Sequence, residues 1–332
     1  MKPSCSDRFK ITPRAAIKFT KLTVFLTCIW LPTKNLNKNI GGVVFEIFWC
    51  SSLFFSLSLF IPLIVAINKF SDNTFTVMKS GILIGGIINF ISKIIIIRNH
   101  REKFQKIDLE LYEFLRSANK YEMAVLQRYV DKCWKFHGCM TCGFYLTTVG
   151  VIIGPLFLPQ KFPSDAIYPF PVDSIITSTL VYLHHCIVGF QCSAALALDY
   201  QAALFLCSGQ ELIQPVRLVF FTRIFVSRVG ITFGAIILLS DQPIAVKLQF
   251  VILFVTLVIS IFVCVWPAEI LMNVSGNLMI RNIFHTSSTH PPAIRKMWLN
   301  VIRRAQSPIT IKIDGFMDAL SFEFYSAVQY HI

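Results

Sequence analysis

Apolar stretches alternate with polar loops along almost the whole chain. A helix needs about 20 apolar residues to cross a hydrocarbon core about 30 Å thick. Six stretches have a suitable length, and a seventh apolar pattern runs to the end of the sequence. They are residues 41–67, 74–97, 136–158, 175–198, 218–240, 248–268 and 315–332. The pattern predicts an all-α, polytopic membrane helix bundle with seven transmembrane helices, which forms a single domain over residues 1–332.

The second stretch is the weakest of the seven, because it contains Lys79, Asn89 and Lys93. Both lysines lie close enough to its ends to extend toward the headgroups, as does Glu46 in the first stretch. The composition agrees with a membrane protein, since 55% of the residues are hydrophobic and 15% are charged. We therefore keep the second stretch as a membrane span.

Basic residues are concentrated in every second loop. Before the first span there are eight Lys and Arg residues against a single acid, and nine more lie at positions 98–135. The intervening loops carry little more than Lys69, Lys161 and Lys247. Because short cytoplasmic loops retain positive charge, the N-terminus is predicted to be intracellular and the C-terminus extracellular.

The net charge of +13 does not indicate nucleic-acid binding, because it is distributed over the four inner segments. Orientation in the membrane and contact with anionic lipid explain it better. Residues 17–30 form a short apolar segment that is interrupted by Lys18 and Lys21. A signal peptide is one interpretation, and an interfacial amphipathic helix that ends at Pro32 is the better one.

The cysteine and histidine residues do not form a recognisable catalytic or metal-binding motif. Cys139 and Cys142 form a CxxC pair near His137, but no second ligand pair accompanies them. His184 and His185 also lack metal-ligand spacing, and no Ser, His and Asp triad is evident. The sequence predicts neither an enzyme nor a metal or cofactor site.

Several local motifs together resemble the insect odorant receptor family. Each motif is weak alone, but the set covers most of the chain. The motifs are Trp-Leu-Pro at 30–32, the proline-rich segment 162–173, Asp199, Trp-Pro-Ala-Glu at 266–269 followed by Ser275, Arg-Arg-Ala-Gln-Ser-Pro at 303–308, Ile-Asp-Gly-Phe at 313–316 and residues 320–324.

The resemblance implies seven helices with an intracellular N-terminus. It also implies a hetero-tetramer with a shared odorant co-receptor subunit, which forms a cation channel opened by a small volatile ligand. The expected location is the plasma membrane of olfactory sensory neuron dendrites. The chain departs from this family pattern in two places. Asp199 lies close to the fifth span, so we expect a shorter cytosolic anchor between the fourth and fifth spans. Residues 315–332 are too few for a complete seventh helix, so we expect a truncated one.

A pocket for a volatile ligand should be enclosed by aromatic and aliphatic side chains with a few polar groups. The resemblance places it in the outer halves of spans two, three, four and six. The candidate ligand-binding residues are Phe144, Tyr145, Thr148, Tyr182, His184 and His185. The candidate pore and gating residues of the last helix are Phe316, Glu323, Phe324 and Val328.

Three other classes of membrane protein also have several membrane-spanning helices. A G-protein-coupled receptor has the opposite orientation, and its Asp-Arg-Tyr and Asn-Pro-x-x-Tyr motifs do not occur here. A secondary transporter should show inverted repeats with broken helices, and only Gly85 and Gly86 suggest such a break. A gustatory receptor channel shares the predicted orientation and is the closest alternative.

Overall fold

The computed structural model describes residues 11–27, 38–157, 160–206 and 213–285, together with Ser321, Glu323 and Ser326. These residues contain helices and no strand, so the all-α prediction is confirmed. The helices are α1 Pro13–Thr23, α2 Lys38–Lys69, α3 Thr74–Asn99, α4 Arg101–Ser117, α5 Lys120–Ile153, α6 Ile175–Leu206, α7 Ile213–Leu239 and α8 Ile244–His285, with two 3₁₀ helices, η2 Phe25–Thr27 and η3 Gly154–Leu156.

Five helices are long and apolar enough to cross a membrane. The five spans are Gly42–Lys69, Thr74–Asn99, Trp134–Leu156, Ile175–Asp199 and Pro215–Leu239, and they match the first five predicted stretches. The sixth predicted stretch lies within α8. The seventh, residues 315–332, lies outside the described residues apart from Ser321, Glu323 and Ser326. The chain is a multi-pass membrane protein.

The basic segment between the second and third spans is also helical. It contains α4 and the first turns of α5, and α5 begins with a capping box. The Oδ1 atom of Asn119 accepts a hydrogen bond from the Glu122 N–H at 2.8 Å, and Glu122 Oε2 accepts one from the Asn119 N–H, also at 2.8 Å. This cap lets α5 begin well before its membrane span.

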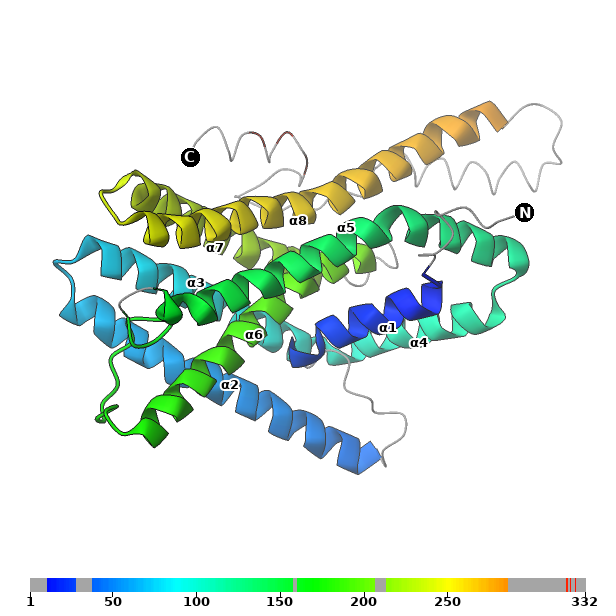
Figure 1. Ribbon diagram of the computed structural model, residues 1–332. Coiled ribbons are helices and arrows are strands. Elements are labelled where there is room, and N and C mark those ends of the chain that lie inside the picture. Colours follow the sequence, from blue (N-terminus) through cyan, green and yellow to red (C-terminus); the bar gives the residue numbers. More distant parts are fainter. Residues whose placement is uncertain are drawn as a thin grey trace, which may run out of the picture.

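The N-terminal helix α1 lies beside α4 and next to the first part of α5 (Figure 1). Lys21 of α1 pairs with Asp108 of α4, and Gln127 of α5 donates a hydrogen bond to the Ile11 carbonyl at 2.9 Å. A helix was expected here, but α1 ends at Thr23 and a 3₁₀ turn follows it. The predicted end at Pro32 falls outside the described residues.

Helix α3 contacts α2, α6 and α7, and α8 packs on α5, α6 and α7. The expectation that Lys79 and Lys93 extend to the headgroups is wrong, because both side chains are buried. Each lysine has a carboxylate within the protein, which removes the need to reach water. Glu46, by contrast, is half exposed and pairs with Arg98 at 2.9 Å.

Candidate ligand-binding cavity

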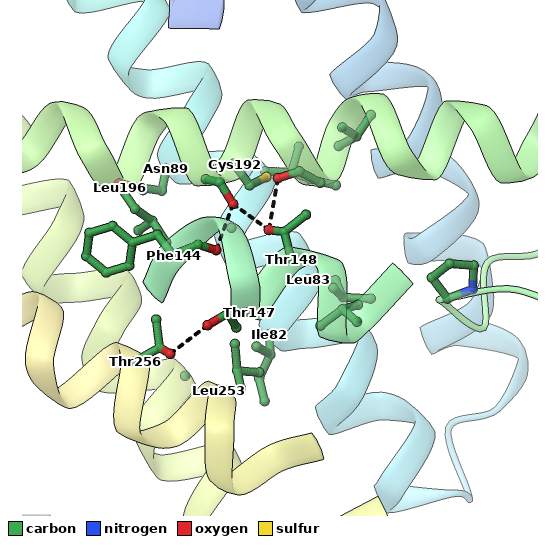
Figure 2. A pocket seen from close by; sticks show the side chains of 18 of the residues that line it. Ile82, Leu83, Asn89, Phe144, Thr147, Thr148, Cys192, Leu196, Leu253 and Thr256 are labelled. Carbon is green, nitrogen blue, oxygen red and sulfur yellow. Dashed lines mark hydrogen bonds between the residues drawn. The ribbon is translucent and has the colours of Figure 1, made fainter. Parts of the chain in front are cut away.

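A cavity of about 160 Å³ lies within the bundle. Helices α2, α3, α5, α6, α7 and α8 contribute to its wall, together with Pro163 and Ser164 of the segment before α6 (Figure 2). Aliphatic side chains are the largest group among the lining residues, and several polar side chains lie between them. An apolar cavity of about 150 Å³ is large enough to hold benzene, so this one can enclose a small organic molecule.

Two glycines allow the helices around the cavity to approach closely. A Cβ atom on Gly230 of α7 would lie 2.8 Å from a methyl carbon of Leu257 in α8. A Cβ atom on Gly189 of α6 would lie 3.0 Å from the methyl carbon of Thr148 in α5. A larger residue at either position would push these helices apart and change the shape of the wall.

Hydroxyl pairs join the helices across the wall (Figure 2). The hydroxyl oxygens of Thr147 in α5 and Thr256 in α8 lie 2.9 Å apart. The hydroxyls of Thr148 in α5 and Ser193 in α6 share a second hydrogen bond, and Ser193 also donates to the Phe144 carbonyl at 3.1 Å. These bonds hold α5 against both neighbours while keeping the polar atoms satisfied.

Three of the six candidate ligand-binding residues form part of the wall: Phe144, Thr148 and His185. Phe144 and His185 are buried, and the Thr148 hydroxyl contacts Gly189 and Ser193 of α6. The structure therefore brings these three together around one cavity. Their contact with a ligand stays a prediction.

The other three candidates lie outside the cavity lining. The Tyr145 hydroxyl donates to the Thr23 carbonyl at 2.5 Å and so ties α5 to the end of α1. The Tyr182 hydroxyl donates to the Ile152 carbonyl at 2.5 Å and ties α6 to α5. His184 points toward α2, where its Nε2 atom lies 2.9 Å from a backbone carbonyl oxygen. Each bond holds neighbouring elements together.

His185 holds the segment before α6 over one end of the cavity. Its Nδ1 atom lies 2.7 Å from the Val181 carbonyl oxygen, and its Nε2 atom lies 2.7 Å from the Ser164 hydroxyl. Because the carbonyl can only accept, Nδ1 carries the proton and Nε2 accepts from Ser164. The ring stacks on Phe162 and meets the edge of Tyr168. Burial raises the pKa of Tyr168, which therefore stays a neutral hydroxyl.

Lys79 fixes the same segment to α3. Its Nζ atom lies 3.0 Å from Asp165 Oδ2 and donates to the Gln160 side chain at 2.6 Å. The backbone N–H of Ile167 donates to the Pro62 carbonyl of α2 at 3.1 Å. The segment is thus bonded to α2, α3 and α6, and it covers the cavity as a fixed part of the fold.

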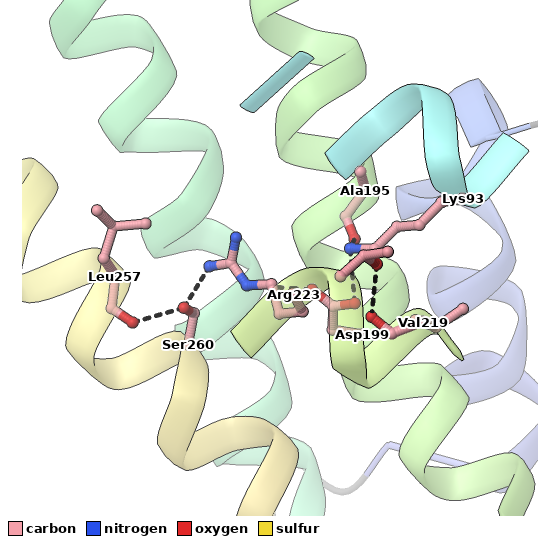
Figure 3. Close-up of polar contacts among 8 residues, drawn as sticks. Lys93, Ala195, Asp199, Val219, Arg223, Leu257 and Ser260 are labelled. Carbon is pink, nitrogen blue, oxygen red and sulfur yellow. Dashed lines mark hydrogen bonds and ion pairs between the residues drawn. The ribbon is translucent and has the colours of Figure 1, made fainter. Parts of the chain in front are cut away.

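A buried ion network lies beside the cavity (Figure 3). Lys93 Nζ lies 2.6 Å from Asp199 Oδ1 and donates to the Ala195 carbonyl at 2.7 Å. Arg223 Nε lies 3.4 Å from Asp199 Oδ2, and the guanidinium also bonds to the Ser260 hydroxyl. Asp199 is 2% exposed and lies between two cations. The network connects α3, α6, α7 and α8.

Arg223 is part of both the buried ion network and the cavity wall, because its side chain also lines the cavity. Neither Arg223 nor Asn89 is among the ligand-binding residues predicted from the sequence, although both line the cavity. One signal was present: ionisable residues inside apolar stretches are usually paired within a bundle. Lys93 and Arg223 both lie in such stretches, and Asp199 is the acid that they share.

Most of the candidate pore residues cannot be placed against the structure. Phe316, Phe324 and Val328 lie outside the described residues. Glu323 is exposed, and its backbone carbonyl accepts a hydrogen bond from the Ser326 hydroxyl at 2.9 Å. A role of all four residues in gating stays a prediction.

The described helices define a polytopic membrane bundle with a largely apolar cavity and a buried ion network. No protein-family model and no curated protein sequence matches the chain. The structure is similar to that of the insect olfactory receptor OR5 from Machilis hrabei, with a TM-score of 0.72 at 11% identity over 96% of this chain and 95% of that chain. The same receptor in complex with eugenol gives a TM-score of 0.69 at 10% identity over 96% of both chains.

This likeness extends over nearly the whole chain and shows that it has the fold of an insect olfactory receptor. The sequence motifs described above led to the same fold, although the sequence identity is low. The fold does not by itself fix the function.

Proposed function

We propose that this protein is an odorant receptor subunit that binds a small volatile ligand in the cavity. In this proposal it gates a cation channel as a hetero-tetramer with a shared co-receptor subunit, in the plasma membrane of olfactory sensory neuron dendrites. The observation that carries the proposal is the largely apolar cavity of about 160 Å³ within the helix bundle of this particular fold.

The size and polarity of the cavity support a volatile ligand. Pockets for drug-sized molecules have volumes of about 300–1,000 Å³, so this cavity suits a smaller molecule. Its aliphatic wall would bury such a ligand, and burial of apolar surface stabilises the complex by about 25 cal/mol per Å². The similar receptor from Machilis hrabei has been observed in complex with eugenol, which is also small and largely apolar.

The position of the cavity supports a role in gating. Six helices contribute side chains to its wall, so a bound molecule can contact several of them. A ligand shifts a conformational equilibrium only if it binds one arrangement better than the other. A change in the packing of α7 or α8 around the ligand provides such a difference, because Arg223 and Leu257 of these helices line the cavity.

The test is to express the chain with an insect odorant co-receptor in a cell line and record currents evoked by a panel of small volatiles. We expect cation currents that require both subunits and depend on ligand concentration. Surface labelling of the chain serves as the control for export. A chain that reaches the surface with its co-receptor and gives no evoked current with any member of the panel contradicts the proposal.

A further inference from the structure

The side-chain oxygen of Asn89 is an unpaired polar atom at the cavity wall. It lies on α3, is 1% exposed and lines the cavity together with aliphatic residues. Its Oδ1 atom is buried and has no hydrogen-bond partner in the part of the chain that the structure describes. Buried polar atoms normally have a partner, because an unmade hydrogen bond is expensive in an apolar surrounding. A molecule in the cavity can supply that partner.

The hydroxyl groups of the wall already donate their protons to the protein. Of Thr147 and Thr256, one donates to the other and the second donates to a carbonyl of its own helix, Gly143 or Ile252. Thr148 donates to Ser193, Ser193 to the Phe144 carbonyl and Ser164 to His185. Arg223 is paired with Asp199 and bonds to Ser260. The polar group of this wall that remains available to a ligand is therefore the Asn89 amide, whose unpaired Oδ1 atom can accept a hydrogen bond. Its Nδ2 group can donate one, so a ligand hydroxyl, which both donates and accepts, matches this amide.

We propose that Asn89 is the hydrogen-bond anchor of the cavity and that the ligands are small alcohols or phenols. The ligand hydroxyl donates its proton to Asn89 Oδ1, and its carbon skeleton fills the aliphatic remainder of the cavity. This inference rests on the proposed function, because it assigns a ligand class to the same cavity. It makes Asn89 the residue that distinguishes a hydroxyl-bearing ligand from a hydrocarbon of the same shape.

The volume and charge of the cavity limit the ligand further. A volume of about 160 Å³ accommodates roughly one substituted ring or a short chain. An anionic ligand would lose its hydration without gaining a free cation, because Arg223 is already paired with Asp199. Neutral hydroxyl compounds fit both conditions.

The test uses pairs of volatiles in which a hydroxyl is replaced by a methyl group of similar size. Suitable pairs are 4-ethylphenol with 4-ethyltoluene, benzyl alcohol with ethylbenzene, and 1-hexanol with heptane. Dose–response curves are recorded for the chain with its co-receptor. We expect the hydroxyl member of each active pair to be about tenfold more potent, as the loss of a partner for a buried acceptor predicts.

Two variants on α3 separate the role of Asn89 from a general effect on the protein. Asn89→Leu has nearly the same shape and no acceptor, and Asn99→Leu makes the same change at an exposed position near the end of the helix. We expect Asn89→Leu to abolish the difference within each pair while keeping the response to the hydrocarbon member. Asn99→Leu should retain the tenfold difference.

The outcomes distinguish this inference from the function on which it rests. Equal potency within the pairs in the unmodified chain, or a preference for acceptor-only analogues such as 4-methylacetophenone, overturns the role of Asn89 and leaves the receptor function intact. The role of Asn89 is also overturned if Asn89→Leu reaches the surface and keeps the potency difference within each pair. If Asn89→Leu does not reach the surface, the comparison of potencies within the pairs in the unmodified chain tests the role of Asn89. Absence of currents with every volatile overturns both proposals.

Discussion

Arg223 lies with its Nε atom 3.4 Å from Asp199 Oδ2, and the same side chain forms part of the cavity wall. Asp199 is in turn 2.6 Å from Lys93, measured from Oδ1 to Nζ. A ligand that moves Arg223 would therefore disturb charges on three helices. The contacts provide a direct physical link between the contents of the cavity and the packing of α3, α6 and α7.

Replacement of Asp199 by Asn should strongly destabilise the protein. It leaves two buried cations, Lys93 and Arg223, without their shared carboxylate, and breaking a buried ion pair costs about 3–5 kcal/mol. We expect a much lower melting temperature of the purified protein in detergent and reduced surface expression. The combined Lys93→Met and Asp199→Asn variant should recover part of the loss, since one of the two unpaired charges is removed.

The matched control is Glu46→Gln, which removes the carboxylate that pairs with Arg98. Both side chains of that pair are about 40% or more exposed, so the change should alter stability by about 1 kcal/mol or less. Similar losses in Asp199→Asn and Glu46→Gln would contradict a special role for the buried network.

Filling the cavity should weaken ligand responses without harming the fold. A Cβ atom on Gly86 would meet only the Cys192 sulfur at 3.8 Å, so the Gly86→Val side chain has room and occupies ligand space. We expect at least a tenfold loss of potency for the best volatile. Gly150→Val makes the same change on α5, where nothing lies within 4 Å, and should leave potency unchanged. Equal effects of the two variants would place the ligand elsewhere.

Local patterns account for what the sequence predicted well. Each span depends only on its own apolar length, so five spans could be read from consecutive residues. The wall of the cavity depends on the rotation of helices that are distant in the sequence. Phe144 lies on the wall while its neighbour Tyr145 bonds to the end of α1, and no pattern along α5 separates them before the partner helices are known.

The same limit applies to the buried charges. The sequence shows Lys93 in an apolar stretch but not the carboxylate that meets it, since Asp199 is far along the chain on α6. Headgroup contact was the simpler expectation, because the lysine lies near the end of its span. Because α3 packs against α6, Lys93 is buried and pairs with Asp199 instead. This packing exists only in the assembled bundle.

Release of the segment before α6 should make ligand dissociation faster. Asp165→Asn removes the partner of Lys79, which is largely buried, so the segment loses one of its bonds to α3. We expect the current to decay several-fold faster after ligand removal, with a modest loss of potency. Asp173→Asn is the control, because its pair with Lys161 is exposed and 3.6 Å long. Unchanged decay in Asp165→Asn would exclude this segment from the ligand exit path.

The predicted orientation can be measured with an epitope inserted between Asp173 and Ser174. This position directly precedes α6 and is exposed, so an insertion leaves the bonds of Lys79 and His185 to the segment in place. Because basic residues are concentrated before the first span and between the second and third, we expect antibody access to the epitope in intact cells and none to an N-terminal tag. Permeabilised cells, in which both tags should be labelled, provide the control. An exposed N-terminal tag with a hidden epitope would reverse the topology and exclude the odorant receptor arrangement.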